Sequence, residues 1–150
     1  MLTDLILEAL FTGADEDEVK RRDELAPKIL LDDWLEEFLK REDITKLPDG
    51  SYDVEGNYDG VDMSFLKISK LPIKFNKVHG SFLIQHNKLT TLEGCPKEVG
   101  HSFVCDNNRL TSLVWAPAKV GTSFWCYDNK KKFTEAEVRT VCDVKGGIYV

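Results

Sequence analysis

The fold of this chain is decided by residues 79–99, HGSFLIQHNKLTTLEGCPKEV, and residues 100–120, GHSFVCDNNRLTSLVWAPAKV. Aligned without a gap, the two segments share Ser, Phe, Asn, Leu, Thr, Leu, Pro and Val in register, so the repeat is 21 residues long. Residue 121 starts another copy, GTSFWCYDNKKKF, and residues 58–78 keep mainly the apolar positions. A fixed period of this kind predicts a solenoid, in which each repeat is one coil that packs on its neighbours.

Apolar columns run through the repeats and predict the interior of the solenoid. Two columns lie two residues apart, the spacing of a strand with one buried face; they comprise Val61, Phe82, Phe103 and Phe124, and Met63, Ile84, Cys105 and Cys126. Further columns hold Ile68, Leu89 and Leu110, then Leu71, Leu92 and Leu113, then Val78, Val99 and Val120. We expect each coil to add one short strand to a parallel sheet, about 4.8 Å from the next strand.

An asparagine column, Asn87, Asn108 and Asn129, follows the predicted strand where the chain turns inward. An amide both donates and accepts hydrogen bonds, so a buried asparagine can satisfy backbone groups of adjacent coils. We therefore expect a structural role for this column. Leu66 occupies the position in the first copy, so the column begins at Asn87.

The order Phe-x-Ile/Cys-x-x-Asn-x-Leu-Thr-x-Leu, followed by Pro-x-x-Val, resembles the leucine-rich repeat, most closely the short bacterial type of pathogen effector proteins. With the segment Phe-Thr-Glu-x-Glu-Val-Arg and the tail Gly-x-Ile-Tyr-Val, residues 44–150 resemble small repeat proteins of T-even-type tailed bacteriophages. Departures are Leu66, Phe75 for proline, and Val114-Trp115 where Glu93-Gly94 stands one coil earlier. The resemblance implies a recognition scaffold without catalysis: a phage protein that binds, and inhibits, a host defence or housekeeping enzyme.

We expect both ends of the repeats to be covered, because a short solenoid exposes apolar ends. Thr134-Glu-Ala-Glu137 is a capping box that predicts a short helix, followed by a strand at Ile148-Tyr149-Val150. The fold class is thus an α+β repeat: a helical cap at 1–43, a leucine-rich-repeat solenoid at 44–133 and a helix-strand cap at 134–150, together one structural domain.

The N-terminal cap is predicted to contain helices over residues 3–13, 16–24 and 27–41, with Asp15 as the N-cap of the second. Pro27 suits the first turn of the third helix, which carries an apolar stripe. Leu47-Pro-Asp-Gly50 predicts a turn, and Tyr52–Val54 a short strand that begins the sheet. We expect the stripe to be packed rather than free to bind a partner.

The composition limits the classes of function. The chain of 150 residues has 42% hydrophobic and 31% charged residues and no apolar run of membrane-spanning length. With no basic region before an apolar segment at its start, we expect a cytoplasmic protein without a secretory signal or a membrane partner. The cysteines Cys95, Cys105, Cys126 and Cys142 lack the spacing of a zinc site, so we expect free, buried thiols.

Residues that point out of the predicted sheet form the candidate partner-binding face. An apolar stripe of Leu83, Val104 and Trp125 lies among polar and aromatic side chains, as a protein-binding hot spot requires. The remaining members are Asp62, Phe65, Gln85, His86, Asp106 and Tyr127. The alternative for Trp125 is packing under the C-terminal cap.

The net charge of -6 divides into a net of -11 over residues 1–60 and +5 over residues 61–150. One cation per coil follows the asparagine position, and this column is a candidate for phosphate binding: Lys67, Lys88, Arg109 and Lys130. The acidic N-terminal helices permit the mirror hypothesis of a nucleic-acid mimic. Both stay open as alternatives to protein binding. Enzyme chemistry, a metal and a cofactor have no motif here, so we expect none.

Overall fold

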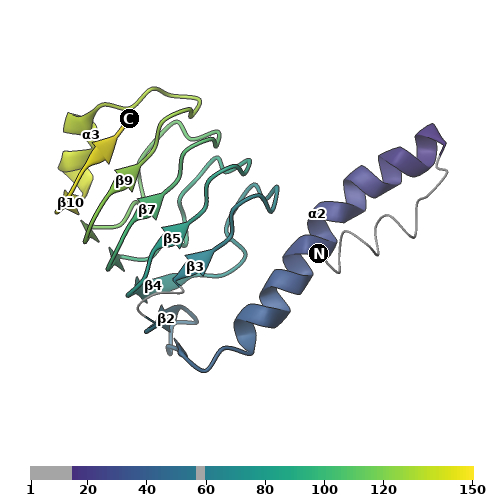
Figure 1. Cartoon of the computed structure of the whole chain (residues 1–150), viewed down its shortest axis with the longest axis horizontal. Coiled ribbons are helices and arrows are strands. Elements are labelled where there is room, and N and C mark those ends of the chain that lie inside the picture. Colours follow the sequence, from purple (N-terminus) through teal and green to yellow (C-terminus); the bar gives the residue numbers. More distant parts are fainter. Residues whose placement is uncertain (1–14, 57–59) are drawn as a thin grey trace. The chain divides into compact units, whose positions relative to one another are not determined.

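The computed structural model describes residues 15–56 and 60–150. The chain forms two compact units, Met1–Arg41 and Glu42–Val150. Within residues 15–56 and 60–150, no helix combines the length and the apolar character that crossing a membrane requires. The repeats lie in the second unit, which is an α+β solenoid with parallel sheets (Figure 1).

The first unit contains one long helix, α2 (Glu16–Leu39). Asp15 is its N-cap, and its carboxylate accepts a hydrogen bond of 2.9 Å from the backbone N–H of Glu18. The predicted break before Pro27 is wrong, because Pro27 lies inside α2. Proline removes one backbone hydrogen bond of the helix, but the residues before it, Glu24-Leu25-Ala26, are strong helix formers and do not favour a turn. The predicted helix over 3–13 lies outside the described residues.

Two sheets run along the solenoid, where the sequence predicted one. The front sheet consists of β3 (Val61–Asp62), β5 (Phe82–Leu83), β7 (Phe103–Val104), β9 (Phe124–Trp125) and β11 (Ile148–Tyr149). The back sheet consists of β1 (Ile44–Lys46), β2 (Tyr52–Val54), β4 (Phe75–Val78), β6 (Glu98–Val99), β8 (Lys119–Val120) and β10 (Asp143–Val144). All neighbours pair in parallel except β1 and β2, which form an antiparallel hairpin.

The second sheet was missed because three of its strands, β6, β8 and β10, are two residues long and each buries one valine. Val54, Val78, Val99, Val120 and Val144 are paired in succession across the back sheet. A single apolar residue per strand does not alternate, so the usual sign of a strand is absent. The predicted strand Tyr52–Val54 exists, but it belongs to the back sheet.

The apolar columns fill the space between the sheets. Phe82, Phe103 and Phe124 have no exposed surface, and their rings follow each other at 6.1 and 5.0 Å between centroids. Burying one such side chain stabilises the fold by about 1.5–3 kcal/mol. The cysteines are free and buried, as expected, and burial raises the pKa of the Cys126 thiol to about 12. These thiols are packing groups rather than nucleophiles.

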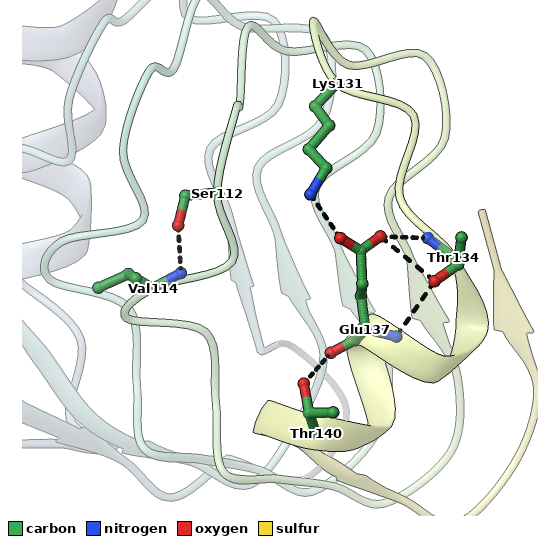
Figure 2. Close-up of polar contacts among 6 residues, drawn as sticks. All are labelled: Ser112, Val114, Lys131, Thr134, Glu137 and Thr140. Atoms are coloured by element: carbon green, nitrogen blue, oxygen red, sulfur yellow. Dashed lines mark hydrogen bonds and ion pairs between the residues drawn. The ribbon is translucent and has the colours of Figure 1, made fainter.

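The C-terminal cap consists of α3 (Glu135–Val141) and strands β10 and β11. Thr134 and Glu137 form the predicted capping box: Thr134 Oγ1 accepts from Glu137 N at 3.2 Å, and Glu137 Oε2 accepts from Thr134 N at 2.9 Å (Figure 2). Lys131 pairs with the other carboxylate oxygen of Glu137. The predicted tail strand is β11, which adds to the front sheet beside β9.

Candidate functional site: the exposed face of the front sheet

The parallel register of the front sheet aligns one exposed side chain from each coil into a stripe. Its members are paired in succession: Asp62, Leu83, Val104, Trp125 and Tyr149. Leu83, Val104 and Trp125 are half-buried, and Tyr149 is exposed. The structure therefore brings the predicted apolar residues together in one continuous stripe and adds Tyr149.

Trp125 is held by the C-terminal strand. Its indole stacks on the ring of Tyr149, with 3.8 Å between centroids and 16° between planes. The predicted alternative, packing of Trp125 by the C-terminal cap, thus holds in part, because Tyr149 belongs to the tail. The sequence predicted a strand at Tyr149 but did not place this residue in the site. The tail departs from the 21-residue period, so the sequence did not show which residue of the front sheet Tyr149 would pair with.

A second, polar column runs beside the stripe and contains Ser64, Gln85, Asp106 and Tyr127. The backbone N–H of His86 donates to the carbonyl of Asp106 at 3.2 Å, which places Gln85 beside Asp106 on the neighbouring coil. Asp106 was expected to be exposed, but its side chain is 3% exposed. It lies on the outer side of the sheet and is covered by its neighbours; Asn107 Nδ2 donates to its Oδ2 at 2.7 Å.

The electrostatics of this column centre on Asp106. Its charge is the main cause that raises the pKa of the Tyr127 phenol above the ordinary value. The neighbouring Gln85 Oε1 is buried and accepts no hydrogen bond within the described part of the chain. Asp62 differs from Asp106, because it is exposed and accepts from both the backbone N–H and the hydroxyl of Ser64, at 2.9 and 2.6 Å.

The chain turns after this column through a residue in the left-handed region of backbone conformation. Phe65, His86, Asn107 and Asp128 have φ of 59°, 54°, 52° and 49°. This region favours glycine and, among other residues, asparagine, aspartate and histidine. Phe65 is the exception; its ring is 62% exposed and stacks on that of His86 at 4.5 Å. The two predicted site residues at this corner therefore form one exposed aromatic pair.

The asparagines hold the corner to the preceding coil. Asn108 Oδ1 accepts from the backbone N–H of Leu89 at 3.0 Å, and its Nδ2 donates to the carbonyls of Ile84 and Cys105 at 2.9 and 3.2 Å. Asn87 and Asn129 make the same set of bonds one coil earlier and one coil later. Each amide thus joins two coils through backbone groups, which leaves these asparagines no free polar atoms for a ligand.

The cation column is exposed along its length and consists of Lys67, Lys88, Arg109 and Lys130. Within residues 15–56 and 60–150, none of the four makes an ion pair. The neighbouring Lys131 is different, because it pairs with Glu137. The column is therefore free to meet an anionic partner.

Some of the acidic residues of α2 have local roles. Glu16, Asp17 and Glu18 occupy the first turn of α2, where negative charge is favourable. Glu36 and Glu37 pair with Lys40 at 2.9 and 3.3 Å. These contacts account for five of the acidic side chains of α2, and the hypothesis of a nucleic-acid mimic stays a prediction.

Trp115 is a second exposed aromatic residue, away from the predicted face. It is 62% exposed and has φ of 73°, and it borders a hollow of about 410 Å³ together with Lys74, Glu93 and Lys97. The sequence signal was the replacement of Glu93-Gly94 by Val114-Trp115, but sequence reasoning assigned no role to it. Among the described residues, no three His, Cys, Asp or Glu side chains cluster in a way that would hold a metal ion.

Comparison of the chain with protein-family models, with curated proteins and with solved structures finds no match. The resemblance to leucine-rich repeats and to phage proteins therefore rests on the residue pattern alone.

Proposed function

We propose that this chain is a phage-encoded leucine-rich-repeat protein that acts in the host cytoplasm. In this proposal it binds a host protein, a defence or housekeeping enzyme, through the exposed face of the front sheet and inhibits it without catalysis. The observation that carries the proposal is the stripe of Leu83, Val104, Trp125 and Tyr149. Large apolar and aromatic side chains in line on a rigid surface are the anchors of protein interfaces.

The rigidity of the surface supports the proposal. Each strand is paired in the sheet, and the corners at His86, Asn107 and Asp128 are each tied to the preceding coil by an asparagine amide. Asn87 Nδ2, for example, donates to the carbonyl of Met63 at 2.8 Å. A surface held in this way loses little conformational entropy on binding. Recognition needs no reacting group, and the buried cysteines supply none.

Affinity capture from host-cell lysate, followed by mass spectrometry, tests the proposal. We expect one partner to be captured by the wild type and lost from Leu83→Asp and Trp125→Asp, because a buried charge on the stripe opposes association. Val114→Asp is the matched control, since Val114 is equally apolar and 63% exposed but lies on another corner. If folded stripe variants, verified by circular dichroism, retain the partner, the proposed interface is wrong.

Nucleic-acid binding is the second candidate, and the unpaired cation column favours it. Side chains that neutralise phosphates release counterions, so affinity falls steeply with salt concentration. We expect a salt-sensitive mobility shift with DNA or RNA under this alternative, abolished by Lys88→Glu with Arg109→Glu. The same double variant should leave capture of a protein partner through the stripe intact.

A further inference from the structure

On neighbouring coils of the front-sheet face, Gln85 has an acceptor without a donor and Asp106 has a buried carboxylate without a cation. Gln85 Oε1 is buried without a hydrogen-bond partner, and Asp106 beside it is 3% exposed. Buried acceptors are costly when they are unpaired, so native structures rarely keep them without a purpose. Their adjacency calls for a group that brings several donors at once.

Asp106 also lacks a positive neighbour. No lysine, arginine or histidine of the described residues lies within ion-pair distance of its carboxylate. The coil's own cations, Lys88 and Arg109, follow the left-handed corner and make no ion pair with it. Asn107 Nδ2 supplies a neutral donor at 2.7 Å, which leaves the negative charge uncompensated.

Aromatic rings stand on the next coil. Trp125 and Tyr127 lie 6.2 Å apart in an edge-to-face arrangement, and the backbone N–H of Asn107 donates to the carbonyl of Tyr127 at 3.1 Å, which places Tyr127 beside Asp106 on the neighbouring coil. A cation that meets the face of such a ring is stabilised further, and a guanidinium more than an ammonium, because it is planar.

We propose that this part of the face recognises a basic side chain of the partner protein, with arginine preferred over lysine. The guanidinium donates to the Asp106 carboxylate and to Gln85 Oε1 and lies against the rings of Trp125 and Tyr127. The five N–H groups of a guanidinium are spread over a planar group, so they can reach two acceptors on coils about 4.8 Å apart. The ammonium of lysine is a compact charge and is less suited to bonding both acceptors at once. This inference rests on the proposed function and names the chemistry of the partner.

Selection of a displayed random-peptide library on the full chain tests the inference. We expect enrichment of arginine-containing peptides, with at least tenfold weaker binding to Asp106→Asn and to peptides in which citrulline replaces arginine. Asp106→Asn keeps the shape of the side chain and its place under Asn107, and its fold is checked by thermal unfolding. Asp49→Asn is the matched control, because Asp49 likewise accepts from the backbone N–H and the hydroxyl of a serine, Ser51, at 3.0 and 2.6 Å, but lies in the turn before β2 of the back sheet.

The outcomes separate the two proposals. Peptides that need Trp125 but bind Asp106→Asn and the wild type equally would overturn the proposed recognition of arginine by Asp106 and Gln85. The proposed protein-binding face would be unaffected by that result. Peptides that bind Trp125→Ala and Asp106→Asn as well as the wild type would overturn both. Arginine enrichment that Asp49→Asn abolishes, with Asp106→Asn unaffected, would likewise contradict the assignment to Asp106.

Discussion

The rings of Trp125 and Tyr149 stack at 3.8 Å between centroids, and this contact joins the C-terminal strand β11 to β9. It makes the tail part of the front-sheet face as well as part of the C-terminal cap. The aromatic end of the stripe therefore depends on a strand that the repeat pattern does not include.

We expect Tyr149→Ala to lower the free energy of unfolding by about 1–2 kcal/mol, because it removes the stack and the area buried in it. Urea denaturation followed by far-UV circular dichroism measures the change. Tyr149→Phe keeps the ring and is expected to match the wild type within error. If alanine and phenylalanine behave alike, the stack does not hold the tail.

Asn108→Ala should destabilise the chain by about 1–3 kcal/mol, because it leaves the backbone N–H of Leu89 without an acceptor and removes one of the two donors to the carbonyl of Ile84. Asn108→Asp separates the two halves of this role, since a carboxylate still accepts from Leu89 but does not donate to Ile84. We expect it to be intermediate at neutral pH. Equal unfolding midpoints for the wild type and Asn108→Ala in urea would contradict the bridging role.

The repeat made the front sheet predictable, because Phe82, Phe103 and Phe124 mark the same inward position in each coil. Most of the back sheet was not predictable from pattern, since Val99, Val120 and Val144 are each the single buried residue of a two-residue strand, which a turn can equally supply. At the site, Leu83 and Val104 followed from the strand alternation. The burial of Asp106 did not follow, because it depends on neighbouring side chains from other coils. The predicted helix break before Pro27 was wrong because the high helix propensity of the surrounding residues outweighs the effect of the proline.

Stability is expected to depend on pH through Glu137. The hydrogen bond from Lys131, and then that from the Thr134 backbone, lower the pKa of this carboxyl below its ordinary value of 4.5. A lowered folded-state pKa contributes stability that is fully present above pH 4.5 and is lost as the pH falls through the folded value. The difference in unfolding free energy between wild type and Glu137→Gln should therefore be largest near neutral pH and shrink below pH 4.5.

Denaturation in urea at a series of pH values measures that difference, and the common acid titration of the other carboxyls cancels in it. Glutamine keeps an acceptor for Thr134 while removing the charge, so the comparison reports the pairing with Lys131. A difference that stays constant from pH 7 to pH 3 would show that the ionised carboxylate does not stabilise the cap.

Trp115→Gly should stabilise the chain by roughly 0.5–1 kcal/mol, because φ at Trp115 is 73°, in the left-handed region that strains a bulky residue but not glycine. The preceding coil shows that the turn accepts glycine. Gly94 has φ of 93° there, and Thr91 Oγ1 accepts from Glu93 N at 3.1 Å just as Ser112 Oγ accepts from Val114 N at 3.1 Å (Figure 2). Little burial is lost, since the indole is 62% exposed. Trp115→Ala is the matched control, because it removes the ring but keeps the strained Cβ, and it should show no gain in thermal unfolding. Equal melting temperatures for the two variants would mean that backbone strain at this corner does not limit stability.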